Sequence, residues 1–150
     1  MNGLGVSVDL PCSFGYTLLF HNVHSLILAR GLNPNIGLLH SERAGHPALA
    51  SDLIEEFRAP IVDTLVLKLL LNRKLLHDDF RTDHLNGSCK LSDPARQLFI
   101  RAFEEKMNTR LIHPETSQKI DYRRAIDGQI SRLITTLRDP AIPYRPFIVR

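Results

Sequence analysis

The feature that most constrains the fold is a long apolar stripe in the middle of the chain, from Leu49 to Leu70. Apolar residues recur there at helical spacing and form a face wide enough for a core helix. They are Leu49, Leu53, Ile54, Phe57, Ile61, Val62, Leu65, Val66, Leu69 and Leu70. Pro60 lies inside the pattern, and proline removes a helical hydrogen bond. We therefore expect a helix that begins near Pro47 or Ala48 and is kinked or broken at Pro60.

The remaining segments predict further helices around this one. A helix from Pro11 to Arg30 is indicated by a proline suited to a first turn and by Gly31, suited to a helix end. Another follows Ser92, a typical capping residue, and a last one runs roughly from Tyr122 to Leu137. The buried face of the helix after Ser92 is predicted to carry Phe99, Ile100, Phe103 and Met107.

One β-hairpin is predicted over residues 77–91, where Asn86-Gly87 is a favoured turn pair. Residues 1–9 are expected to be irregular. The final stretch "DPAIPYRPFIVR" holds three prolines and cannot be a regular helix. A chain of 150 residues is long enough for one domain with a core. The sequence thus predicts a single, mainly α domain over residues 1–150 with one small β-hairpin.

Charge is unevenly distributed along the chain. Residues 1–60 hold three Lys/Arg and five Asp/Glu, whereas residues 61–150 hold the other sixteen Lys/Arg and eleven Asp/Glu. An acidic part beside a basic part fits a metal site next to a polyanion-binding surface, although solvated helix faces give this pattern more often. Two cysteines without metal or redox spacing favour a reduced, cytoplasmic chain. No stretch approaches the ~20 apolar residues of a membrane span, so no membrane association is expected.

A histidine and a group of acids form the candidate site. His40 ends an apolar stretch, and Asp52 and Glu55 share one face of the predicted core helix, with Glu56 next to them. One imidazole with one or two carboxylates is a ligand set for Mn²⁺ or Mg²⁺, and the nitrogen favours Mn²⁺. Such an ion can polarise a phosphodiester and activate a water or a 3′-hydroxyl.

Structural explanations stay open beside this hypothesis. The helix macrodipole stabilises acids near a helix start by a few tenths to ~1 kcal/mol each, which accounts for the carboxylates without a metal. A second group of histidines and acids, from His77 to His84, has no recognised ligand spacing and is typical of a solvated turn. Tyr16 can stack or hydrogen-bond near a site, but a core tyrosine is the more common role.

Three separated motifs are similar to one protein family. They are "SFGYTLLFHNV", "GLNPNIGLLHSERAGHPALASDLIEEFRAPIVD" and "LIHPETSQKIDYRRAIDGQISRLI". In this order they resemble the CRISPR-associated integrase that inserts new spacers into the CRISPR array. The likeness covers residues 13–150 and leaves residues 1–12, taken as irregular, outside it. It implies the helical C-terminal catalytic domain of that family.

The resemblance implies a metal-dependent DNA endonuclease and integrase with Mn²⁺ or Mg²⁺ as cofactor. It also implies double-stranded DNA as substrate, a homodimer, and a small partner protein of the CRISPR adaptation complex. By the match of motifs, His40 and Glu55 are implied as metal ligands, and Asp52 as an acid that supports the site one helical turn earlier.

DNA contacts are expected from the arginines. Arg58 stands where the family has an arginine after its acidic pair. Arg73, Arg123 and Arg124 are further candidates in the basic part of the chain, and of the last two only one is expected to touch DNA, because adjacent helical residues face different ways. The alternative for these cations is a solubilising surface.

One part of the family pattern has no counterpart. The family's first glutamate ligand lies upstream of the "FGY" helix, but "MNGLGVSVDLPC" contains no glutamate, and Asp9 is its sole acid. The family's N-terminal β domain is absent as well. We therefore expect a truncated form with an incomplete metal site, which binds Mn²⁺ weakly and cuts DNA poorly or not at all. The alternative is a non-catalytic DNA- or partner-binding scaffold, or a decayed fragment of that family.

Overall fold

The computed structural model describes residues 8–34 and 48–149, and this part of the chain is mainly helical. The helices are α1 (Asp9–Ala29), α2 (Ala48–Glu55), the π-helix η1 (Arg58–Asp63), α3 (Thr64–Leu71), the 3₁₀ turn η2 (His77–Asp79), α4 (Asp93–Met107) and α5 (Tyr122–Arg138). The strands are β1 (Phe80–Thr82), β2 (Cys89–Leu91), β3 (Arg110–Ile112) and β4 (Lys119–Asp121). The prediction of a mainly α fold is confirmed.

The central apolar stripe forms α2, η1 and α3, and the predicted break at Pro60 is confirmed. Pro60 has no N–H to donate, so a regular α-helix would lose a hydrogen bond at this position. The chain instead forms the π-helix η1 across it. The side chain of Thr64 donates to the Pro60 carbonyl at 2.8 Å and starts α3. Phe57, Ile61 and Val62 remain fully buried through the break, so the stripe keeps its core face.

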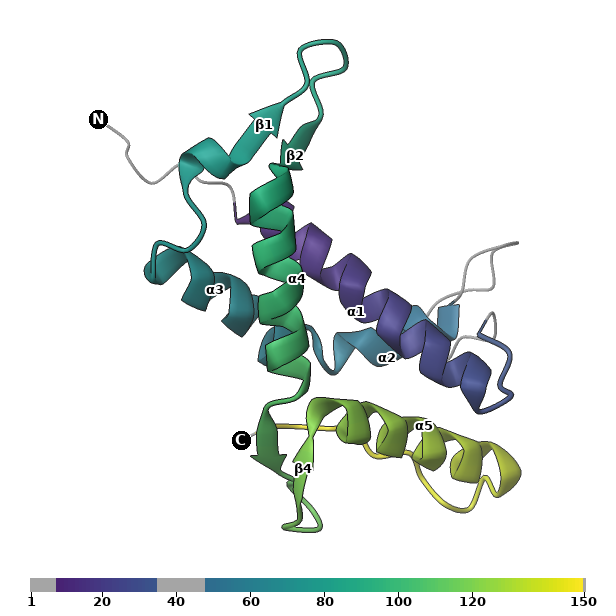
Figure 1. Cartoon of the computed structure of the whole chain (residues 1–150). Helices are drawn as coiled ribbons and strands as arrows, with labels where there is room; N and C mark the ends of the chain where they lie inside the picture. Colours follow the sequence, from purple (N-terminus) through teal and green to yellow (C-terminus); the bar gives the residue numbers. More distant parts are fainter. Residues whose placement is uncertain (1–7, 35–47, 150) are drawn as a thin grey trace.

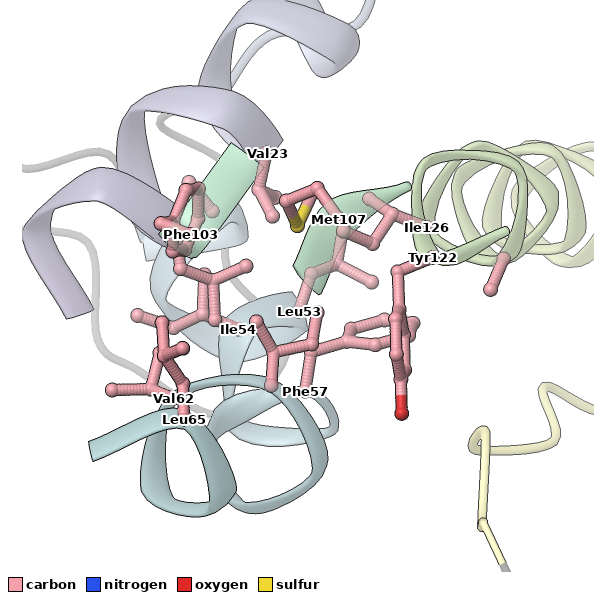
Figure 2. Close-up of a cluster of buried hydrophobic side chains, with 14 of the residues drawn as sticks. Val23, Leu53, Ile54, Phe57, Val62, Leu65, Phe103, Met107, Tyr122 and Ile126 are labelled. Atoms are coloured by element: carbon pink, nitrogen blue, oxygen red, sulfur yellow. The ribbon is translucent and has the colours of Figure 1, made fainter. Parts of the chain in front are cut away.

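The core lies where α1, α4 and α5 meet this broken helix (Figure 2). Val23 from α1, Phe103 and Met107 from α4, and Ile126 from α5 converge on it. Gly15 lets α1 approach closely: a Cβ there would lie 2.5 Å from Val62 Cγ1. Since real Cβ atoms essentially never come so near another carbon, a larger residue here would force Val62 or α1 to shift.

The structure holds two antiparallel hairpins in its described part, where one was predicted. The predicted hairpin pairs Phe80 with Leu91, but Asn86-Gly87 lies within a longer loop over residues 83–88 and is not a two-residue turn. The second pairs Arg110 with Asp121. The two hairpins lie at opposite ends of α4 (Figure 1).

Two smaller expectations need correction. Helix α1 begins at Asp9, so residues 9–12 are helical and not irregular. Ile100 is 39% exposed, because Phe99, Phe103 and Met107 fill the buried face of α4 without it. The prolines keep the stretch after α5 non-helical, as predicted, and Phe147 in this stretch is buried in the core. This stretch runs back along α5 (Figure 1).

Two local predictions are confirmed. Ser92 caps α4, and its hydroxyl accepts from the Ala95 N–H at 3.3 Å. Gly31 follows α1 with a φ of +73°, a conformation that favours glycine. Within residues 8–34 and 48–149, no helix combines the length and apolar character that crossing a membrane requires.

Candidate functional site

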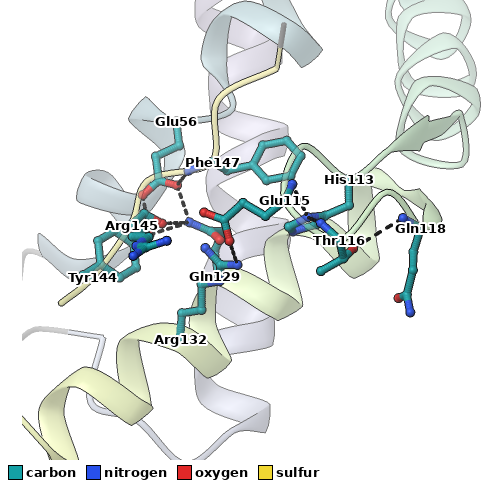
Figure 3. Close-up of polar contacts among 10 residues, drawn as sticks. All are labelled: Glu56, His113, Glu115, Thr116, Gln118, Gln129, Arg132, Tyr144, Arg145 and Phe147. Carbon is teal, nitrogen blue, oxygen red and sulfur yellow. Dashed lines mark hydrogen bonds and ion pairs between the residues drawn. The ribbon is translucent and has the colours of Figure 1, made fainter. Parts of the chain in front are cut away.

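The two adjacent glutamates at the end of α2 have different surroundings. Glu55 is exposed, and among the described residues its carboxylate meets one partner, the guanidinium of Arg58, at 3.1 Å. Glu56 is partly buried and accepts hydrogen bonds from Gln129 Nε2 and from the Phe147 N–H, both at 2.8 Å, and from the Tyr144 hydroxyl (Figure 3). Glu56 therefore holds the C-terminal stretch against the core, while the carboxylate of Glu55 remains available to a ligand.

Arg58 links Glu55 to helix α1. Its guanidinium lies over the ring of Tyr16, 4.7 Å from the ring centre, and forms the ion pair with Glu55. The hydroxyl of Tyr16 donates to Asp63 Oδ1 at 2.5 Å. Within the described residues, Arg58 Nε is buried and has no hydrogen-bond acceptor. The Arg58 guanidinium is thus held by the Tyr16 ring and the Glu55 carboxylate, and its Nε–H has no acceptor among the described residues.

The electrostatics of this cluster keep its hydroxyl and thiol groups protonated. The pKa of Tyr16 is raised above its ordinary value, chiefly because its hydroxyl donates to the Asp63 carboxylate and also because it is partly buried. Burial raises the pKa of the nearby Cys12 thiol, and the charge of Asp63 raises it further. Neither group is therefore ionised near neutral pH, and neither is a nucleophile there.

Asp52 and His40 complete the predicted site in different ways. Asp52 lies on α2 one turn before Glu55, and it is 6% exposed, so it does not belong to a solvated acidic surface. His40 lies outside the described residues, which end at Pro34 and resume at Ala48. The assignment of His40 and Glu55 as metal ligands, with Asp52 in support, therefore stays a prediction.

The described residues supply one candidate carboxylate for a divalent cation. Glu55 is 43% exposed, and its one partner among these residues is a surface ion pair, which contributes at most about 1 kcal/mol and can be exchanged for a metal ion. Among the residues that the structure describes, no three His, Cys, Asp or Glu side chains are grouped to hold a metal. In the competing group, His77 and Asp78 are exposed and 3.8 Å apart, as expected for a solvated turn.

The four arginines predicted to contact DNA lie in different environments. Arg123 is engaged within the fold: it donates to Asn22 Oδ1 at 2.7 Å and pairs with Glu104. Arg124, the next residue on α5, is exposed. Arg73 follows α3 with a φ of +53° and is also exposed. Only one of Arg123 and Arg124 was expected to contact DNA, and Arg124 is the one whose side chain is exposed.

The link between Tyr16 and Asp63 was not predicted from the sequence. Tyr16 is not the core residue expected of it, since it is only partly buried and its hydroxyl bonds a carboxylate 47 positions away. No local pattern connects two residues so far apart. The pair of Glu55 and Arg58, by contrast, is three residues apart on consecutive helical turns and is visible in the sequence.

Known proteins share both sequence and fold with this chain. The family model of "CRISPR associated protein Cas1" matches residues 8–105. The CRISPR-associated endonuclease Cas1 3 of Thermus thermophilus is 40% identical over 138 residues, which are 92% of this chain and 41% of that protein.

Solved structures agree with the sequence matches. A CAS1 protein from Thermotoga maritima matches with a TM-score of 0.80 and 27% identity, over 87% of this chain and 40% of that one. A casposase bound to an integration product matches with a TM-score of 0.81 over 92% of this chain and 37% of that one, and at 24% identity it shows a shared fold alone. The chain therefore spans about two fifths of the length of these proteins.

Proposed function

The chain belongs to the family of the CRISPR-associated protein Cas1, and on this premise we propose that it acts on DNA in spacer acquisition, as a metal-dependent endonuclease and integrase. The relative from Thermus thermophilus is named an endonuclease, which supports this class of reaction. The proposed substrate is double-stranded DNA. By the same resemblance, the proposed assembly is a homodimer with a small partner protein of the CRISPR adaptation complex.

The observation that carries the proposal is the contrast between Glu55 and Glu56. One carboxylate is committed to three hydrogen bonds, and the other stands exposed at a helix end beside a clamped arginine. The proposed metal ligands are His40 and Glu55, with Mn²⁺ favoured over Mg²⁺ because one ligand is a nitrogen. When bound, such an ion polarises a phosphodiester and activates the attacking oxygen.

The residues around Glu55 have their own proposed roles. Arg58 is released from Glu55 when the carboxylate turns to a cation, and its guanidinium is then free to pair with a phosphate oxygen. The ring of Tyr16 keeps that guanidinium in place, and the bond from Tyr16 to Asp63 fixes the ring between α1 and η1. Asp52, buried one turn away, supports the orientation of Glu55.

A third metal ligand is not provided by a glutamate ahead of α1, since residues 1–8 contain none. Removing one carboxylate from a three-ligand site weakens binding, so the 150-residue chain alone is expected to bind Mn²⁺ weakly and to cut DNA slowly.

Cleavage of a labelled DNA duplex with and without Mn²⁺ tests the proposal. The expected result is slow cleavage that needs Mn²⁺ and falls more than about tenfold in Glu55→Gln, since even outer-shell partners of a metal are worth 10–100-fold. Asp78→Asn, which alters an exposed acid of the competing group, serves as the control and should leave the rate unchanged.

Two other outcomes would change the conclusion. Salt-dependent DNA binding without any Mn²⁺-dependent cleavage favours the alternative of a non-catalytic DNA- or partner-binding scaffold. Cleavage that persists at full rate in Glu55→Gln contradicts the proposed site.

A further inference from the structure

A cavity of about 440 Å³ is lined by residues of α3, of the turn after it and of α4. Its walls come from Thr64 through Lys74 on one side and from Leu98 through Lys106 on the other. Buried leucines of α3, Leu65 and Leu69, line its apolar part. A volume of this size falls in the range of ligand sites in proteins.

The charged groups around the cavity are predominantly positive. Its four cations are Lys68, Lys74, Arg101 and Lys106, and Glu105 is the one acid in the lining. None of these four cations forms an ion pair with any residue in 8–34 or 48–149. Arg123 and Arg132, by comparison, pair with Glu104 and Glu115 within the fold. The cavity lining thus carries an excess of positive charge.

Lys106 and Lys68 are close enough to repel each other. Burial lowers the pKa of Lys106, and the charge of Lys68 lowers it further. The Lys106 ammonium lies 5.6 Å from the centre of the Tyr122 ring, a contact that holds the side chain in place. Two neighbouring ammonium groups are stabilised together by one anion placed between them.

We propose that this cavity binds phosphate groups of a DNA backbone, with Lys68 and Lys106 as the inner contacts and Lys74 and Arg101 around them. The choice of DNA as the polyanion rests on the proposed function. The first lining residue, Thr64, directly follows Asp63, the acceptor of the Tyr16 hydroxyl. Lysine ammonium groups bind phosphates without reading sequence, which suits a protein that accepts DNA of any sequence.

DNA affinity measured in EDTA tests this site without involving the metal chemistry. The variant Lys68→Gln/Lys106→Gln is compared with Lys90→Gln/Lys119→Gln, which removes two exposed lysines on the hairpins. Fluorescence anisotropy of a labelled duplex of arbitrary sequence gives Kd at several salt concentrations. Two lost phosphate contacts reduce the slope of log K against log salt by about 1.8 and weaken binding roughly tenfold or more near 0.1 M salt. The control should change Kd less than about twofold.

A second variant guards against a folding defect. Arg101→Gln alters an exposed side chain and should weaken binding in the same direction while leaving the melting temperature unchanged. Inorganic phosphate, at the same phosphate concentration as the duplex, should compete poorly, because it reaches one contact and not several.

Four results would overturn the proposal. In the first two, the wild-type chain fails to bind DNA, or the cavity variant binds DNA as its control does. In the other two, inorganic phosphate competes as well as the duplex, or the cavity variant loses binding to an acidic protein partner but keeps binding to DNA. Failure of the proposed function is a separate result. In that case the cavity variants weaken DNA binding as expected, but neither wild type nor Glu55→Gln cleaves DNA with Mn²⁺.

Discussion

Replacing Glu56 by alanine is expected to lower the free energy of unfolding by about 3 kcal/mol, while the same change at Glu55 should cost less than about 1 kcal/mol. The two residues are identical and adjacent, so propensity and charge effects are nearly matched. Only their partners differ. The comparison therefore isolates the hydrogen bonds that connect the end of α2 to the C-terminal stretch.

The magnitude follows from the groups that lose a partner. Gln129 still has acceptors in the Tyr144 hydroxyl and the Arg145 carbonyl, both at 3.0 Å, so its loss is small. The Phe147 N–H and the Tyr144 hydroxyl lose a charged acceptor, and such hydrogen bonds contribute about 1.5–3 kcal/mol each. Partial exposure of Glu56 lets water replace some of this, which places the sum near the lower limit, about 3 kcal/mol.

Urea and thermal denaturation followed by far-UV circular dichroism measure this difference. For a domain of this size, a loss of about 3 kcal/mol lowers Tm by roughly 6–12 °C. Limited trypsin digestion gives a second readout, because the stretch containing Arg145 should be cut faster once Phe147 is no longer held in place. Equal stabilities of Glu56→Ala and Glu55→Ala would refute the reasoning, and the C-terminal stretch would then be held by its other contacts, among them the packing of Phe147 on Phe57.

Three further predictions concern stability. Gly15→Ala should lower the free energy of unfolding in urea by about 1–3 kcal/mol, because the added Cβ overlaps Val62. Gly128→Ala should be neutral or stabilising, because a Cβ there meets no described atom within 4 Å. Asp121→Ala should cost about 1 kcal/mol, since its carboxylate accepts from the Arg124 N–H at 2.8 Å and caps α5; an unchanged Tm would contradict this role. The pKa values of Tyr16 and Tyr144 are raised in the fold, so above the ordinary value of about 10 the unfolded chain loses protons that the native state keeps. Stability should therefore fall as pH rises past about 10, and Tyr144→Phe should make the urea midpoint less dependent on pH in that range.

Local signals in the sequence were sufficient for most of the helices. The position of Ser92 and Pro94 predicts where α4 begins, and Pro60 predicts the break in the core stripe, because each acts on the backbone of its own segment. The second hairpin escaped prediction because its strands have three residues each and its loop lacks an Asn-Gly pair. It is closed by His113 Nδ1, which accepts from the N–H groups of Glu115 and Thr116 at 3.2 Å.

The different roles of Glu55 and Glu56 could not be predicted from the sequence. The partners that engage Glu56 lie 73 to 91 residues further along the chain, so only the fold brings them together. The α3–α4 cavity likewise combines lysines from two helices separated by a hairpin. The pair of Glu55 and Arg58 could be recognised in the sequence, because it depends only on two residue types at helical spacing.

Mn²⁺ binding to the 150-residue chain, followed by the electron paramagnetic resonance signal of free Mn²⁺, tests the central claim most directly. We predict weak binding that disappears in Glu55→Gln and in His40→Ala, and that persists in Asp78→Asn. Binding of Mn²⁺ that is equally strong in wild type, Glu55→Gln and His40→Ala would contradict the assignment of these two residues as the ligands of a metal site that acts on DNA.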